Sequence, residues 1–200
     1  MIKVLNCKKK NYVSQLNLLL EKRRSSARIS INIVTKIVSD VKKYKVKALL
    51  KYEKRFSNNR QIKPSKEKIR KAIRSLDPKI KKAIDFAYKR ILKFHSKQKT
   101  KNIKYIDNLN NKLEYKFVPI ESVGIYVPAN LPSTLLMNAI PAKIAKVKRI
   151  VLVNPKLNGS LNPAVLYAAK KIGIKEIFNM GGAQAISSLA YVQKVDKIVG

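Results

Sequence analysis

A pair of glycines between an apolar segment and a helix-like segment is the feature of this sequence best suited to binding a ligand. Residues 179–191 read NMGGAQAISSLAY, with Gly181 and Gly182 followed two positions later by Gln184. Glycine lets a ligand approach bare backbone, and the amino end of a helix offers free N–H groups. Gln184 can both donate and accept hydrogen bonds. The pattern indicates a nucleotide site, although the same glycine pair also forms ordinary tight turns between a strand and a helix.

Few other residues are suited to catalysis or to metal binding. The only histidine, His95, ends a helix-like segment, where a hydrogen-bonding role is more common than metal ligation. No histidine and cysteine residues have the spacing of a zinc site, and no Ser, His and Asp set can be assembled after residue 123. The only acidic residues there are Glu176 and Asp196, and neither a Walker nor a GxGxxG motif occurs. We therefore predict no catalytic residue and no metal ligand in this chain.

Strand-like and helix-like segments alternate from residue 123 onward. Such alternation predicts right-handed βαβ units, which bury a parallel sheet between layers of helices. Ligands of these sheets bind at the carboxyl ends of the strands, where we expect Tyr126, Asn154 and the glycine pair. The expected strands are residues 123–127, 150–153, 176–180 and 195–199, and the expected helices run from Ser133 to about residue 147, from Asn162 to Gly173, and over residues 183–191.

The first 115 residues have helical patterns instead, and all six glycines lie after residue 123. We expect the apolar stripes of these helices, which include Ile33, Ile80 and Phe94, to lie in the core. Residues 98–112 are polar and are expected to form a connection, followed by a short strand at 113–117. The expected helices lie near residues 33–41 and 48–52, with two more that begin at Pro64-Ser65 and at Asp77-Pro78.

The net charge of +34 admits two interpretations. One is a basic module that binds nucleic acid, because positive charge attracts phosphates. The other is a composition shifted toward lysine that leaves the fold unchanged. The second is favoured because lysine outnumbers arginine by 36 to 9 and no zinc-finger spacing or RNP-type aromatic motif occurs. We expect no specific nucleic-acid partner, and the basic module remains an alternative.

Features of membrane and secreted proteins are missing from the sequence. No run approaches 18 apolar residues, so no membrane span is expected. Residues 1–10 lack the apolar core of a secretory signal, and the single cysteine, Cys7, fits a reducing compartment. We therefore predict a cytoplasmic protein of one or two domains.

Several segments together resemble the histidinol dehydrogenase family, and the similarity runs over nearly all 200 residues. The segments PSTLLMNAIPA and GGAQAI are specific to the family when they occur in this order. The other similar segments are SVGIYVP at 122–128, RIVLVNP at 149–155, KVDKIVG at 194–200 and, in the helical part, DVKKYKVKALLKYEKRF at 40–56 and FHSKQK at 94–99.

The resemblance implies an NAD- and zinc-dependent oxidoreductase of histidine biosynthesis, which oxidises L-histidinol to L-histidine through histidinal. Family members are longer homodimers, and the chain resembles only their N-terminal half. The resemblance implies NAD contacts at Tyr126 and Gln184, whereas the zinc ligands and the Glu-His pair for acid–base catalysis fall in the other half. The implied fold is α/β, with an N-terminal helical segment at 1–115 and an incomplete Rossmann-like, NAD-binding parallel sheet of about four strands and three helices at 116–200.

The chain departs from the family pattern at several positions. The loop at residues 129–131 and the connection at 192–193 are shorter than in the family. Lys45-Val46 stands where the family has Gly-Asp, and Lys146 stands where it has glycine, a residue suited to ending a helix. These departures favour an alternative in which the chain is a catalytically inactive, truncated fragment.

Overall fold

The computed structural model describes residues 5, 7–8, 10–157 and 159–200, with the backbone alone for residues 22–30. Residues 1–10 were predicted not to form a secretory signal, and residues 1–4, 6 and 9 of this segment lie outside the described residues. None of the described helices combines the length and hydrophobicity needed to cross a lipid bilayer. The helices are α1 (Tyr12–Ser57), α2 (Lys66–Arg74), α3 (Pro78–Ser96), α4 (Pro132–Ile144), α5 (Pro163–Ile172) and α6 (Gly182–Tyr191).

Four strands form a parallel sheet in the order β5-β4-β3-β6, which confirms the expected α/β fold. Tyr126 lies opposite Val153, and Val153 lies opposite Phe178, so the carboxyl ends of three strands meet at one edge. The chain adds β4 and β5 on one side of β3 and then returns to place β6 on the other side. The strands are β3 (Ser122–Tyr126), β4 (Arg149–Val153), β5 (Glu176–Phe178) and β6 (Lys197–Val199), the last two shorter than expected.

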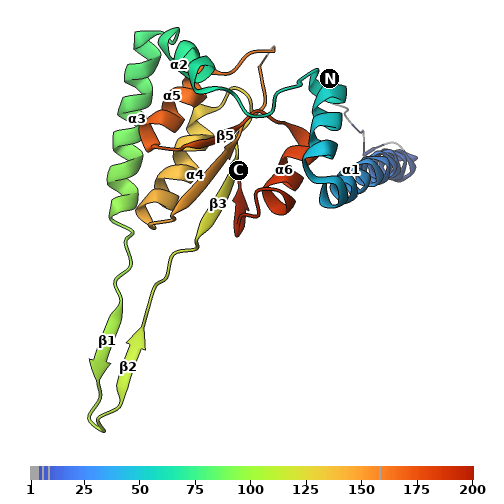
Figure 1. Cartoon of the computed structure of the whole chain (residues 1–200). Coiled ribbons are helices and arrows are strands. Elements are labelled where there is room, and N and C mark those ends of the chain that lie inside the picture. Colours follow the sequence, from blue (N-terminus) through green and yellow to red (C-terminus); the bar gives the residue numbers. More distant parts are fainter. Residues whose placement is uncertain (1–4, 6, 9, 158) are drawn as a thin grey trace.

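Helices cover both faces of this sheet (Figure 1). The side chains of its strands alternate between two apolar cores. Ile125, Leu152 and Ile177 point to the core that the sheet shares with α2, α3, α4 and α5. Val151 and Phe178 belong to the opposite core, which α1 and α6 close. A strand with both faces buried must be apolar throughout, which explains the continuous hydrophobic runs of β3 and β4.

Three of the predicted helix starts are confirmed by hydrogen bonds to their first turns. The Asp77 carboxylate accepts a hydrogen bond from the Lys79 amide at 2.7 Å, and the Asn162 side chain accepts one from the Ala164 amide at 2.9 Å. Ser65 caps α2 in the same way. The prediction for Ser133 was wrong, because α4 begins at Pro132, and proline has no amide hydrogen that needs a cap.

The two helices expected within residues 33–52 are confirmed, but the first buries less of its surface than predicted. Helical geometry breaks at Lys45, which has φ 50° and ψ −128°. Ile37 and Leu49 are buried on either side of the break, whereas Ile33 is 54% exposed. The expectation of a core role was also wrong for Ile80 and Phe94 of α3, since α4 and α5 cover only part of that helix.

The polar segment expected to be a connection contains a strand. β1 (Ile103–Ile106) pairs in antiparallel register with β2 (Lys112–Tyr115), so the short strand predicted at 113–117 belongs to a hairpin and not to the main sheet. The hairpin extends away from the body of the molecule (Figure 1), and all of its strand residues are exposed. The alternating sequence IKYI was missed because neither face of this ribbon is covered.

The end of α4 places a lysine in the left-handed backbone region. Lys146 has φ 65°, and its amide donates to the Lys143 carbonyl at 3.0 Å while the Val147 amide donates to the Ala142 carbonyl at 3.0 Å. This pair of hydrogen bonds is the Schellman motif, in which glycine is preferred at the left-handed position. Gly173 fills the left-handed position at the end of α5.

Replacing Lys146 by glycine is therefore expected to stabilise the fold. Relief of the left-handed strain outweighs the added freedom of the unfolded chain, so Lys146→Gly should raise the free energy of unfolding by about 0.5–1 kcal/mol. Urea denaturation measures this quantity. Lys148→Gly is the matched control, because Lys148 has no positive φ, and it should lower stability. Equal destabilisation by both variants would contradict the argument.

A bidentate ion pair joins two strands at the amino edge of the sheet. Arg149 Nε and Nη2 donate to the two carboxylate oxygens of Glu176, each at 2.8 Å, and Arg149 Nη1 donates to the Gln193 carbonyl at 2.7 Å. The hydrogen bonds from Arg149 lower the pKa of the Glu176 carboxyl below its ordinary value. Glu176, one of the two acidic residues after residue 123, therefore has a structural role, because it connects β5 to β4.

The Glu176 carboxylate makes stability depend on pH in the acidic range. Because its pKa is lower when folded, its contribution is complete above its unfolded pKa of about 4.3 and is lost as the pH falls through the folded value. Glu176→Gln should therefore lose less stability than the parent protein between pH 6 and about pH 3. Urea unfolding across this range is the measurement, with Glu114→Gln on the exposed hairpin as control. A parallel pH dependence in parent and Glu176→Gln would contradict this role.

Candidate functional site

The strand order reverses between β3 and β6, and this is where open parallel sheets bind ligands. Tyr126 is the last residue of β3, and Gly200 directly follows β6. A side chain at position 200 would collide with the Tyr126 carbonyl oxygen, so the two backbones lie in close contact. The carboxyl edge at this reversal point is the candidate site, and the prediction that Tyr126 lies at a strand end is confirmed.

Tyr126 is partly exposed at this edge. Its ring is half-buried and packs against the core between the sheet and α1 and α6. Its hydroxyl makes no hydrogen bond with any described residue. The backbone therefore holds the ring in place, while the hydroxyl keeps its capacity to donate and to accept.

Asn154, the other side chain expected at a strand end, shapes the loop beside Tyr126. It is 3% exposed, and its amide nitrogen donates to the carbonyls of Val127 and Pro128, each at 3.0 Å. Both groups belong to the segment that leaves β3. Asn154 thus fixes the path of that segment and has no amide hydrogen left for a ligand.

The glycine pair forms the turn between β5 and α6, as predicted. Gly182 is the first residue of α6 and has φ 64°, a backbone conformation that favours glycine. The Gly181 amide, expected to be free for a ligand, instead donates to Glu53 Oε1 at 3.0 Å. A carboxylate of the protein itself occupies the position that a phosphate would take in a nucleotide-binding turn.

Glu53 is the centre of a buried polar cluster that includes Gln184. Glu53 is 1% exposed, and its Oε1 accepts a second hydrogen bond from Gln184 Nε2 at 2.8 Å. Asn59 Nδ2 contacts Glu53 Oε2 at 3.4 Å and donates to the Asn179 carbonyl at 2.7 Å. No cation of the described residues pairs with Glu53, so these donors supply its stabilisation.

The Glu53 contact fixes the orientation of the Gln184 amide. A carboxylate only accepts hydrogen bonds, so the NH₂ group of Gln184 must face Glu53. Gln184 Oε1 then points away from Glu53 and accepts no hydrogen bond from a described residue. Gln184 is 2% exposed, so its side chain is held in one position by its surroundings.

The remaining ionisable residues considered in the sequence have structural contacts. Asp196 Oδ2 accepts hydrogen bonds from the amide and the hydroxyl of Ser122, at 2.7 and 2.8 Å, and the Ser122 contacts lower the pKa of the Asp196 carboxyl. His95 Nδ1 lies 2.6 Å from Gln98 Oε1, which agrees with the hydrogen-bonding role predicted for it. Across the described ranges, no three His, Cys, Asp or Glu side chains are grouped so that they could hold a metal ion.

Comparison with known proteins identifies the family. A family model described as histidinol dehydrogenase matches residues 20–200. The chain belongs to the histidinol dehydrogenase family. Histidinol dehydrogenase of Pelagibacter ubique is 58% identical over 207 aligned residues, which cover 100% of this chain and 48% of that protein. The enzyme of Caldanaerobacter subterraneus is 44% identical, over 84% of this chain and 41% of its own length.

The solved structures agree with the sequence comparison. The crystal structure of histidinol dehydrogenase from Elizabethkingia anophelis has a TM-score of 0.79 and 38% identity, over 84% of this chain and 41% of that chain. The present member of the histidinol dehydrogenase family therefore spans about half the length of the relatives it matches. The resemblance inferred from the sequence motifs, including its restriction to the N-terminal half, is confirmed.

Sequence reasoning overlooked Glu53, although a signal for it exists. Leu49 and Glu53 lie on the same side of the part of α1 that follows the break at Lys45, because residue 53 follows the buried Leu49 at the i, i+4 spacing. An acidic residue at an apolar position of a helix indicates a buried polar partner elsewhere in the chain. The partner itself could not be deduced, since Gln184 is 131 residues away in this histidinol dehydrogenase homologue.

Removal of the Glu53 charge is expected to destabilise the protein. Glu53→Gln places an NH₂ group against the donors of its neighbours, so the free energy of unfolding should fall by about 1–3 kcal/mol. Urea denaturation tests this expectation. Glu67→Gln removes one charge from the exposed first turn of α2 and should change stability by less than about 1 kcal/mol. An equal effect of the two substitutions would show that the buried contacts are not the cause.

Proposed function

We propose that this chain is the cofactor-binding portion of an NAD- and zinc-dependent histidinol dehydrogenase, an oxidoreductase of histidine biosynthesis. The substrate would be L-histidinol, oxidised through histidinal to L-histidine. The observation that carries the proposal is the family match over residues 20–200, and the positions of Tyr126 at the end of β3 and of Gln184 in the first turn of α6 support it. We further propose the division into a helical region at 1–115 and a Rossmann-like NAD-binding domain at 116–200, a homodimer, and a cytoplasmic location.

The residues present at the edge fit a dinucleotide. Tyr126 would contact it through its ring and hydroxyl, and Gln184 would accept a hydrogen bond through Oε1. When bound, NAD⁺ would accept the hydride that leaves the substrate carbon. Because Glu53 already occupies the Gly181 amide, the glycine turn would support Gln184 and would not hold a phosphate itself.

The described residues do not provide a site for zinc, in contrast to the edge that fits a dinucleotide. No group of three ligating side chains occurs among them, so no step through the metal is derived from this chain. The zinc ligands and the acid–base pair would belong to the region of the relatives that lies outside the match. The proposed role of this chain is therefore to bind and orient the nucleotide.

Mixing the chain with the rest of a relative tests the proposed activity. Purified chain is mixed with a polypeptide that contains the remaining part of the Pelagibacter ubique relative, with L-histidinol, NAD⁺ and zinc. The expected result is NADH formation, followed by its absorbance, in the complete mixture and not when either polypeptide is omitted. Absence of NADH from the complete mixture, with both polypeptides folded, would contradict the proposal.

Two alternative functions lead to different results. An inactive, truncated fragment is favoured by Lys45 and Lys146, which have positive φ where the family has glycine. Tight, saturable NAD⁺ binding measured by calorimetry would count strongly against this alternative. A basic nucleic-acid-binding module rests on the net charge of +34 alone. DNA binding that lacks sequence preference and disappears at moderate salt would show general electrostatic attraction instead.

Truncation of Tyr126 tests the cofactor contact directly. Tyr126→Ala should weaken NAD⁺ binding by about ten-fold, because the ring contact at the edge is lost. Isothermal titration calorimetry measures the Kd, and thermal unfolding of the same sample verifies that the fold is retained. The control is Tyr44→Ala, which removes a 51% exposed tyrosine from α1 and should leave the Kd unchanged. Equal Kd values for the parent protein and Tyr126→Ala would exclude this residue from the cofactor site.

A further inference from the structure

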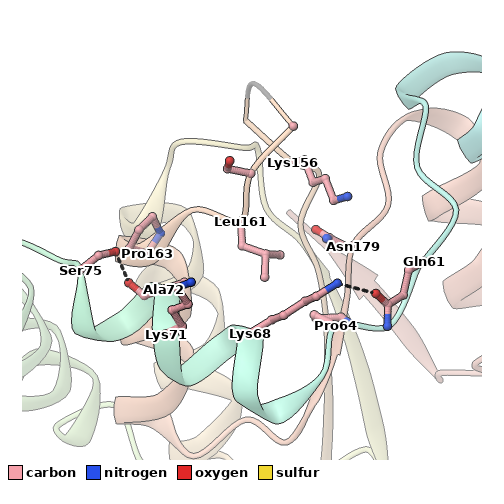
Figure 2. Close-up of a pocket in the computed structure, with 12 residues that line it drawn as sticks. Gln61, Pro64, Lys68, Lys71, Ala72, Ser75, Lys156, Leu161, Pro163 and Asn179 are labelled. Carbon is pink, nitrogen blue, oxygen red and sulfur yellow. Dashed lines mark hydrogen bonds between the residues drawn. The ribbon is translucent and has the colours of Figure 1, made fainter.

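A cavity lies at the carboxyl ends of β4 and β5, between α2 and the segment that follows β4 (Figure 2). Its volume is about 530 Å³, within the range of small-molecule sites of about 300–1,000 Å³. Lys68 and Lys71 of α2 and Lys156 after β4 line it, together with Asn179 at the end of β5. Gln184, in contrast, lies on α6 against α1. The cavity is therefore distinct from the proposed nucleotide edge.

The charged residues that line this cavity are lysines, and two of the three make no ion pair or hydrogen bond with a described residue. Lys68 Nζ donates to Gln61 Oε1 at 2.9 Å, as drawn in Figure 2. The ammonium groups of Lys71 and Lys156 have no hydrogen bond or ion pair with any described residue. No carboxylate occurs among the described lining residues. The two free ammonium groups give the cavity the positive charge that a dianion such as a phosphate monoester requires.

Asn179 provides a polar group inside the cavity wall. The backbone is held on both sides, because its amide donates to the Ile62 carbonyl at 2.6 Å and its carbonyl accepts from Asn59. The side chain is 3% exposed, and its Oδ1 is buried without a hydrogen-bond partner among the described residues. A buried acceptor of this kind costs stability unless a donor reaches it. Figure 2 shows Asn179 beside Lys156 and Leu161 at the cavity.

The rest of the wall is apolar. Pro64, Ala72, Leu161 and Pro163 line it between the charged residues. A ligand that matches every part of the cavity carries a phosphate for the lysines, hydroxyl donors for Asn179 and a carbon face for the apolar wall. A sugar phosphate has all three. We propose that this cavity is a binding site for a phosphorylated sugar, separate from the nucleotide site.

Calorimetric titration of the full chain with glucose 6-phosphate at about 150 mM salt tests the proposal, since this salt screens exposed charges. The expected result is saturable binding to one site. Inorganic phosphate should bind about ten-fold more weakly, and glucose should not bind detectably, because each lacks part of the matching chemistry. Saturating NAD⁺ should leave the affinity for glucose 6-phosphate unchanged, so the result does not depend on the proposed enzymatic activity.

Lysine substitutions locate the site. Lys71→Gln and Lys156→Gln should each weaken glucose 6-phosphate binding by about ten-fold. Lys104→Gln, with the same change of charge on the exposed hairpin, should have less than about a two-fold effect. Asn179→Ala should reduce the preference for glucose 6-phosphate over inorganic phosphate. The lysines of α2 and of the hairpin are exposed, so these variants retain the fold even where Asn179→Ala does not.

Three outcomes would overturn the proposal. One is the absence of saturable glucose 6-phosphate binding at this salt concentration. Another is equal weakening by Lys71→Gln, Lys156→Gln and Lys104→Gln, which would mean attraction to the whole basic surface. The third is displacement of glucose 6-phosphate by NAD⁺, which would make the cavity part of the nucleotide site.

Discussion

The buried carboxylate of Glu53 is the interaction on which the arrangement of this protein depends. It lies on α1, yet its partners are the Gly181 amide and Gln184 of the β5–α6 turn, and Asn59 beyond the end of α1. A buried charge that loses its donors is strongly unfavourable, so these contacts must form together. These hydrogen bonds hold α1 against α6, and the two helices together cover one face of the sheet. The same contacts set the direction of the Gln184 amide at the candidate cofactor edge.

The amino-terminal helices therefore do more than precede the sheet. α1 completes the core that contains Val151 and Phe178, and α2 and α3 complete the core on the opposite face. The sharp change in composition near residue 115 predicts a domain boundary, but both cores draw residues from each side of it. Apolar area on either face of the sheet is removed from water only when these helices are present. The candidate edge accordingly depends on these helices, and α1 reaches it directly through the hydrogen bond between Glu53 and Gln184.

The sequence contains the local features of this fold more clearly than the long-range ones. Parallel strands and the helix starts at Asp77 and Asn162 depend on residues within a few positions, and they were predicted correctly. The exposed hairpin was missed because period-two patterning reports a covered face, and this ribbon has none. Ile80 and Phe94 have helical spacing, but spacing cannot show that neighbouring helices cover only part of a stripe. The Glu53 cluster joins segments more than a hundred residues apart, so its hydrogen-bond partners could not be predicted from the sequence. Only the position of Glu53 on an apolar stripe could have been recognised.

The same buried cluster also connects the two sides of the strand ends. Asn59 contacts the Glu53 carboxylate and donates to the Asn179 carbonyl, and Asn179 lines the cavity beside α2. Gln184 on one side and Asn179 on the other are thus held by one continuous set of hydrogen bonds. Gly181 adds a constraint, because a Cβ there would lie 3.0 Å from Pro155 Cβ in the segment that leads to Lys156. The turn that resembles a nucleotide loop is therefore fixed in place by contacts on both of its sides. The Gly181 amide and the Gln184 NH₂ group form hydrogen bonds within the protein and are not free for a ligand.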